Sequence, residues 1–195
     1  MNERKYRMSA RADSAEQTGE RIVDAMLAAL RTTPYERVRL EDIASAAGVT
    51  VQTVIRRFGS KPALMTTTVE RELARIAHRR EGALSAEPQE TIRALVEHYE
   101  EYGVLILKTY SEAPLVPGLG EIAARGRAYH VDWCRRAFAG HLAERGDSAD
   151  TSRRLAQIVA ICDATTWRIL RFDGGLGQPE TEQAINELLA PVLRA

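Results

Sequence analysis

Apolar side chains recur at intervals of three and four residues along most of this chain, the spacing that is typical of amphipathic helices. No segment sustains the alternation of apolar and polar positions that predicts a strand. We therefore predict an all-α protein. Besides a helix-turn-helix segment, the spacing predicts helices over Thr18–Arg31, Lys61–Arg80, Glu90–Tyr110, Glu121–Leu142, Ala149–Phe172 and Pro179–Leu193.

Two short helices joined by a tight turn are predicted within residues 40–61, LEDIASAAGVTVQTVIRRFGSK. Apolar residues lie on one face of the first helix, and Gly48 follows it, where a left-handed turn favours a residue without Cβ. Thr50 can cap the second helix. This is the pattern of a helix-turn-helix, whose second helix enters the major groove of DNA.

The second of these helices has one apolar and one polar face. Val54 and Phe58 are four residues apart and share the apolar side, whereas Gln52 and Arg56 point the opposite way. At the N-terminal end of this helix Gln52 can pair with adenine, and Val51 and Thr53 can contact a thymine methyl group. The residues predicted to bind DNA are Thr50, Val51, Gln52, Thr53, Ile55, Arg56, Arg57 and Lys61.

The segment TVQTVIRRFGSK resembles the recognition helix and following basic turn of the TetR family of transcriptional repressors. The usual family string is Ser/Thr-x-x-Thr-Leu-Tyr-x-aromatic/His-Phe-x-x-Lys. This chain fits it at Thr50, Thr53, Val54, Phe58 and Lys61. It departs at Ile55, where the family usually has Tyr, and at Arg57, where it often has His or Tyr. Ile55 cannot donate a hydrogen bond to phosphate, whereas Arg57 can bind phosphate through its charge.

The resemblance implies a three-helix DNA-binding head at residues 17–62 and a helical body at residues 63–195 that binds an effector and dimerises. Residues 1–16, which carry four basic side chains and little apolar content, are predicted to be a flexible tail, with a phosphate-contacting arm as the alternative. The body could hold a ligand between aromatic, histidine and cysteine side chains, although such residues more often form a core. The candidate pocket residues are His98, Tyr99, Tyr102, Tyr110, His130, Trp133, Cys134 and Trp167.

The last two predicted helices each carry an apolar stripe that could pack against a second copy of the chain, as the resemblance implies. The alternative is that these stripes complete the core of one subunit. The candidate dimer residues are Leu155, Ile158, Cys162, Ile169, Ile185, Leu188, Leu189 and Val192.

The distribution of charge weakly favours DNA binding by the N-terminal part of the chain. The net charge of the 195 residues is zero, but residues 1–65 carry 11 basic and 8 acidic side chains. A slightly basic head on a slightly acidic body suits DNA contact at the head. The chain has no apolar run of membrane-spanning length, no secretory signal and only two cysteines, which together predict a cytoplasmic protein.

The predicted function is a homodimeric repressor that a small-molecule effector releases from a palindromic DNA operator. Neither a cofactor nor a metal is expected: His130 and Cys134 are four residues apart, but a two-residue match is a weak metal signal. The sequence resembles neither a nucleophile elbow nor a phosphate loop, so we do not expect an enzyme. The alternative is a helical interaction or ligand-binding protein that has lost specific DNA binding.

Overall fold

The chain folds into helices that form two compact units. The computed structural model describes the backbone of residues 2–82, 84, 87–143 and 148–194, and this described part contains no strand, which confirms the all-α prediction. Unit 1 comprises Met1–Glu72 and Glu112–Gly120, and unit 2 comprises Leu73–Ser111 and Glu121–Ala195. None of the described helices has the length and apolar character of a membrane span.

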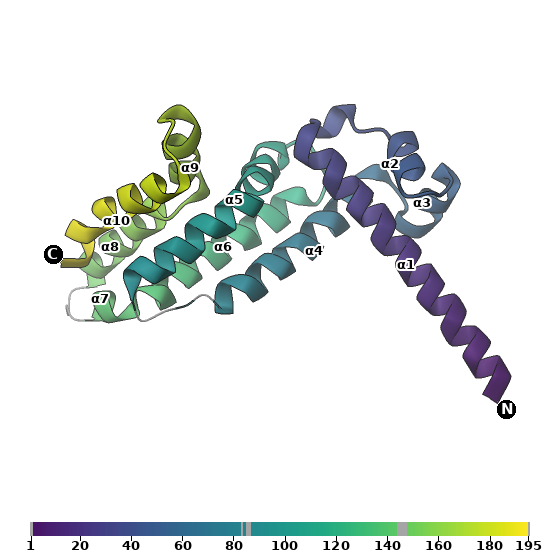
Figure 1. The fold of residues 1–195 in the computed structure, drawn as a ribbon, viewed down its shortest axis with the longest axis horizontal. Coiled ribbons are helices and arrows are strands. Elements are labelled where there is room, and N and C mark those ends of the chain that lie inside the picture. Colours follow the sequence, from purple (N-terminus) through teal and green to yellow (C-terminus); the bar gives the residue numbers. More distant parts are fainter. Residues whose placement is uncertain (1, 83, 85–86, 144–147, 195) are drawn as a thin grey trace. The chain divides into compact units, whose positions relative to one another are not determined.

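Unit 1 is a head whose first helix is the longest of its helices (Figure 1). Its elements are α1 (Asn2–Thr32), the 3-10 turn η1 (Tyr35–Arg37), α2 (Leu40–Ala46), α3 (Val51–Phe58) and the first part of α4 (Lys61–Gly82). Ile22, Met26 and Leu30, which recur at helical spacing on α1, are fully buried. Segment Glu112–Gly120 joins this unit, where Glu112 Oε1 accepts a 2.9 Å hydrogen bond from the backbone N–H of Tyr35.

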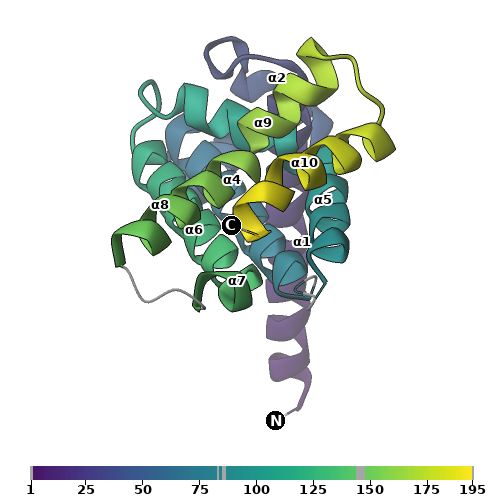
Figure 2. The same ribbon diagram turned by 90° about the vertical axis from the view of Figure 1, so that its left-hand side faces the viewer.

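Unit 2 is a helical body with one continuous core. It contains the rest of α4 together with α5 (Pro88–Glu112), α6 (Leu119–Ala137), α7 (Ala139–Ala143), α8 (Ser148–Ile161), α9 (Ala164–Arg168), the π-helical turn η2 (Ile169–Asp173) and α10 (Gln178–Arg194). Helices α8 and α10 pack side by side (Figure 2). The core draws buried side chains from α5, α6, α8, α9 and α10, including both tryptophans.

Three expectations about the backbone need correction. The structure continues α1 back to Asn2, where a flexible tail was expected, and residues 2–16 contain no Gly or Pro that would end a helix. The side chains of the proposed basic arm lie outside the described residues. The single helix predicted over 149–172 is broken near Asp163, whose carboxylate accepts a 2.8 Å bond from Thr165 N and caps α9. The helix predicted from Glu121 ends at Ala137, before α7.

Candidate functional site: the exposed face of the helix-turn-helix

The turn between α2 and α3 has the local geometry that the sequence predicts. Gly48 has a φ of 65°, the left-handed conformation in which a residue without Cβ is least strained. Thr50 has extended backbone angles, and its hydroxyl accepts a 3.2 Å hydrogen bond from Thr53 N. This cap satisfies one of the free N–H groups at the start of the helix and fixes where α3 begins.

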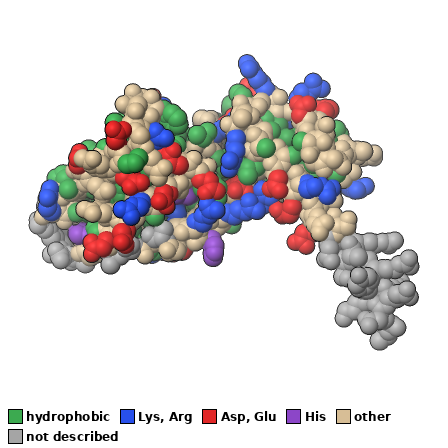
Figure 3. Space-filling model, in the orientation of Figure 1, with side chains coloured by type: hydrophobic (Ala, Val, Ile, Leu, Met, Phe, Trp, Pro, Cys, Tyr) green, Lys and Arg blue, Asp and Glu red, His purple; other side chains and the backbone are tan. Residues whose placement is uncertain are grey.

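Helix α3 packs through one face and presents the other to solvent. Val54 is 1% exposed and anchors the helix in the head core. Gln52, Arg56 and Arg57 are exposed. Ile55, which stands where the resemblance places a tyrosine, is 46% exposed. In Figure 3, Lys and Arg side chains project from the surface of the head. Helix α3 therefore presents polar and basic side chains to solvent, while its apolar side packs against the head core and fixes its position.

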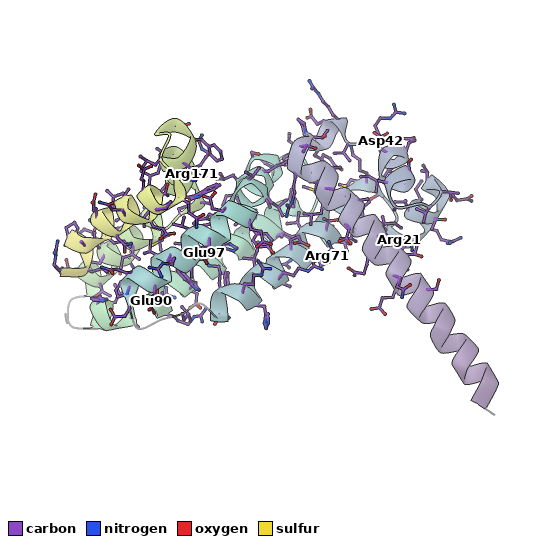
Figure 4. All side chains as sticks on the ribbon, in the orientation of Figure 1. Arg21, Asp42, Arg71, Glu90, Glu97 and Arg171 are labelled. Carbon is purple, nitrogen blue, oxygen red and sulfur yellow. The ribbon has the colours of Figure 1, made fainter. Side chains whose placement is uncertain are left out.

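Arginines and carboxylates fasten the helices of the head to one another. Arg21 on α1 donates a 3.2 Å bond to the carbonyl of Ala47, at the C-terminal end of α2. Arg71 on α4 donates 2.7 Å bonds to both Glu20 and Asp24 on α1. Figure 4 labels Arg21 and Arg71 on these helices. The supporting side of the head is therefore held by directed contacts as well as by its apolar core.

Arg57 lies against α1 as well as near solvent. A Cβ added to Gly19 would come within 2.3 Å of Arg57 Nε, so the guanidinium passes directly over this glycine. The ring of the neighbouring Phe58 lies 6.0 Å from the guanidinium carbon. The small residue on α1 thus leaves room for the side chain that we predict to bind phosphate.

Lys61 is placed differently from the predicted phosphate contacts. Its Nζ donates 2.9 Å hydrogen bonds to the carbonyls of Tyr35 and Val38 and lies 4.3 Å from the centre of the Tyr35 ring. These carbonyls belong to η1 and to the residue that follows it, 23 to 26 residues away in the sequence. The structure therefore gives the Lys61 charge a role inside the head that local spacing does not reveal.

Replacing Lys61 with Met is expected to lower the stability of the head by about 1–3 kcal/mol, because two or more carbonyls lose a charged donor. Thermal unfolding followed by circular dichroism measures the loss. Arg56→Met on the exposed face of α3 is the matched control and should leave the melting temperature unchanged. If Lys61→Met weakened DNA binding without any melting loss, its main role would be the phosphate contact.

Most of the predicted pocket residues form the core of unit 2. Tyr99, Trp133, Cys134 and Trp167 are at most 2% exposed and belong to one buried cluster. The Tyr99 hydroxyl donates a 2.7 Å bond to the carbonyl of Cys162, and Trp133 Nε1 donates a 3.2 Å bond to the carbonyl of Arg80. For these residues the structure supports the core alternative. Tyr102 and His130 are also buried, and Tyr110 is half-buried.

A cleft of about 320 Å³ opens beside this core. It is lined by Arg79 and Arg80 of α4 and by Ala94, Glu97, His98 and Glu101 of α5. Of the predicted pocket residues, only His98 is in this lining. The sequence analysis missed Arg80, although it continues the apolar row of α4 four residues after the buried Ile76. A cation in an apolar row is the signal that could have marked it.

The imidazole of His98 is buried in the cleft wall and stacks on Tyr102, with ring centres 5.2 Å apart. Burial, and to a lesser extent the positive charge of Arg80, lower the pKa of His98 to about 3. The side chain is therefore neutral at physiological pH. The charged or titratable groups around it are Arg79, Arg80, Glu97, Glu101 and His130.

This shift predicts that His98 makes the fold less stable in acid. Between the folded pKa of about 3 and the unfolded value of 6.5, the unfolded chain binds a proton that the folded chain does not. Stability therefore falls as the pH drops below 6.5, by at most about 1.4 kcal/mol per pH unit from this group. Urea unfolding of wild type and His98→Gln between pH 4 and 7 should show a shallower acid loss in the variant. Equal slopes would contradict a buried neutral His98.

The predicted dimer residues divide between the core and the surface. Four of them, Ile158, Cys162, Ile185 and Leu189, are at most 1% exposed and lie in the core of unit 2, so they are not available to a partner. Ile169 and Leu188 are 47% and 46% exposed. Leu155 and Val192 are half-buried. Phe172, which the sequence analysis did not select, is 60% exposed on η2.

The two cysteines are buried and free. Cys134 Sγ lies 3.7 Å from His130 Nε2, so the predicted i, i+4 pair does face one another. Among the described residues no group of three or more His, Cys, Asp or Glu side chains is arranged to hold a metal ion.

The fold and the head can now be compared with known proteins. The family model for bacterial regulatory proteins of the tetR family matches residues 22–67. A transcriptional regulator from Rhodococcus sp. Rha1 is similar over 90% of this chain and 96% of its own, with a TM-score of 0.73 and 15% identity. A TetR transcription regulator from Haloarcula marismortui is similar over 89% and 96%, with a TM-score of 0.66 and 18% identity.

A protein from Saccharomonospora viridis in complex with choline also shares the fold, with a TM-score of 0.62 and 19% identity over 92% of this chain and 96% of its own. At such identities these likenesses establish the fold alone. No curated protein sequence matches the chain.

The fold and the exposed α3 face together define a helix-turn-helix head on a helical body. More narrowly, the head matches the TetR family model and the whole chain has the fold of TetR-type transcriptional regulators, which confirms the resemblance predicted from the recognition helix.

Proposed function

We propose that this protein is a homodimeric repressor that binds a palindromic operator through α3 and leaves it when a small molecule binds the body. One observation carries the DNA-binding part: α3 is anchored by the buried Val54 while Gln52 and Arg56 remain exposed. A helix held from behind by its apolar side can insert its polar side into a major groove.

Five side chains of α3 have a proposed task. Gln52 reads adenine, and the methyl groups of Val51 and Thr53 contact thymine. Arg57 binds phosphate, and Arg56 binds either phosphate or a base edge. We leave Lys61 out of the proposed DNA contacts, because its Nζ is already bonded to carbonyls within the head.

One head offers a small DNA interface, so tight and specific binding favours two heads on a two-fold symmetric site. Exposed apolar side chains on unit 2 support a dimer: Ile169, Phe172 and Leu188 are 47%, 60% and 46% exposed. Isolated apolar residues are common on surfaces, but three from neighbouring C-terminal elements are consistent with a symmetric contact. Sedimentation of wild type and Leu188→Glu tests this, with a dimer expected for the former only.

The effector part of the proposal depends on α4. This helix contributes residues to both units, and Arg71 fixes it to α1 within the head while Arg79 and Arg80 line the cleft. A ligand that prefers one arrangement of α4 would shift the population of heads able to bind the operator. The choline complex of the Saccharomonospora viridis protein supports small-molecule binding as a use of this fold.

Selection from a library of random duplex DNA tests the DNA-binding function without knowledge of the operator. The expected result is an enriched sequence with two-fold symmetry, bound with an affinity that falls steeply as salt rises. Ile55 favours the alternative of a helical protein that has lost specific binding, because it cannot make a tyrosine's phosphate contact. No enriched sequence, and no salt-sensitive gel shift with DNA upstream of its own gene, would support that alternative.

A further inference from the structure

Arg80 is a buried cation without a carboxylate partner among the described residues. The side chain is 5% exposed, and its Nε has no hydrogen-bond partner. The nearby Glu81 carboxylate is already held by Arg136, through bonds of 2.6 and 2.7 Å. Burying a charge without an opposite charge costs free energy, and a bound anion would offset that cost.

The contacts that Arg80 does make are with neutral groups. One guanidinium nitrogen lies 3.2 Å from His130 Nδ1, and the guanidinium carbon lies 4.0 Å from the centre of the Trp133 ring. Because arginine only donates, Nδ1 of His130 accepts, which leaves Nε2 to donate its 3.2 Å bond to the carbonyl of Val159. The guanidinium is thereby oriented by its neighbours without a hydrogen bond to any carboxylate among the described residues.

His98 lines the same cleft and also has polar atoms without a hydrogen-bond partner. It is 7% exposed, and neither of its ring nitrogens has a hydrogen-bond partner. A neutral imidazole carries one N–H donor and one acceptor. The cleft wall therefore holds three buried polar atoms without a hydrogen-bond partner: Nε of Arg80 and the two ring nitrogens of His98.

The rest of the lining limits the charge of a suitable ligand. Arg79 forms an ion pair with Glu101, so these two charges cancel. Glu97 is exposed on α5 (Figure 4), and its negative charge disfavours a polyanion in the cleft. A single negative charge matches the one lining guanidinium that is not bonded to a carboxylate, whereas a phosphate dianion would add repulsion from Glu97. A volume of about 320 Å³ suits a small organic molecule.

We propose that the cleft between α4 and α5 binds a small organic monocarboxylate, whose carboxylate accepts hydrogen bonds from Arg80 and His98. This inference names the chemistry of the effector and rests on the effector-binding part of the proposed function. Bonds from a guanidinium to a carboxylate are charge-assisted and are stronger than those between neutral groups.

Thermal unfolding of the full chain in the presence of matched probes tests the site. The probes are acetate, butyrate, hexanoate and benzoate, each compared with its neutral amide at equal ionic strength. At least one carboxylate should raise the melting temperature by about 5 °C at a 100-fold excess over its Kd, and its amide should not. If no carboxylate protects more than its amide, the proposal is overturned.

Two variants assign the effect to the cleft. Arg80→Gln should weaken carboxylate binding, measured by calorimetry, by about 10- to 100-fold because a charged donor is lost. Arg135→Gln, on the exposed surface of α6 and outside the cleft, is the matched control and should bind carboxylate as wild type does. Unchanged affinity in Arg80→Gln would place the carboxylate elsewhere. Because Arg80→Gln could also disturb the core, His98→Phe provides a second test and should likewise weaken binding.

Operator binding is measured separately, so the two proposals can fail independently. Carboxylate binding through Arg80 with no specific DNA binding would support the site and contradict the repressor. Specific DNA binding with no preference for any carboxylate over its amide would support the DNA-binding function and contradict the carboxylate site.

Discussion

Gly103→Ala is expected to destabilise the body by about 1–3 kcal/mol, because the added methyl group has no room. A Cβ at Gly103 on α5 would lie 2.4 Å from Cζ3 of Trp167 and within 2.8 Å of two further atoms of its ring. Side chains do not pack that closely, so the helix or the indole must move. The melting temperature should fall by roughly 2–4 °C for each kcal/mol lost.

Trp167 cannot easily move away from that methyl group. Its Nε1 donates a 2.9 Å bond to Glu100, and its ring packs against Tyr99 and Phe172 with centres 5.8 and 5.5 Å apart. Arg171 also bonds both oxygens of Glu100, at 2.7 and 3.0 Å, and so fixes the acceptor. A displacement of the indole would break these contacts together, which is why we expect one of the larger stability effects here.

Gly126→Ala is the matched control for this prediction. Gly126 also lies inside a body helix, α6, but a Cβ there would meet Leu73 and Tyr110 at 3.6 and 3.9 Å, which are ordinary contact distances. Since Ala is favoured over Gly in helices, this variant should gain about 0.5–1 kcal/mol. Equal effects of the two substitutions on the melting temperature would contradict the close packing of Trp167 on Gly103.

The second large expected effect concerns DNA. Gln52→Ala and Arg56→Ala should each weaken binding to the enriched operator by about 10- to 100-fold, because each removes a proposed contact from both heads. Their melting temperatures should stay close to that of wild type, since both side chains are exposed. Fluorescence anisotropy with a labelled duplex measures the affinities.

The specificity and the salt dependence of the weakened DNA binding distinguish a base contact from a phosphate contact. A base contact by Gln52 predicts relaxed specificity at one position of each half-site, whereas a phosphate contact by Arg56 predicts a salt dependence reduced by about one charge per head. Arg135→Ala, on an exposed site of α6 in unit 2, is the control and should bind as wild type does. A large melting loss in either α3 variant would assign these residues to folding rather than to DNA.

The helix-turn-helix could be predicted from the sequence because its signals are local. Gly48 permits the left-handed turn, Thr50 caps the next helix, and Val54 identifies the buried side of α3. Each of these constraints acts over four residues or fewer, so spacing alone reveals it. The exposure of Gln52 and Arg56 follows from the same geometry, since they lie opposite Val54 on a short helix.

The body was harder to interpret because its helices are apolar on more than one side. The pair Ile158 and Cys162 has the same spacing whether it meets its own subunit or a second copy, and the structure places it in the subunit core. The sequence analysis also missed the break before α9, because apolar spacing continues through Asp163. Only the bond between Asp163 and Thr165 shows that one helix has ended and another has begun.

By itself, the sequence determined that the chain is helical, that a helix-turn-helix occupies residues 40–61 and which face of α3 meets solvent. These features follow from backbone preferences and helical periodicity, which act between near neighbours. The tertiary structure decided what Lys61 and Arg80 do, because their partners lie far away in the sequence. Lys61 binds carbonyls 23 to 26 residues earlier, and Arg80 meets His130 50 residues later. A long cationic side chain can face water, a carbonyl or a buried ring at the same helical position, and only packing selects among them.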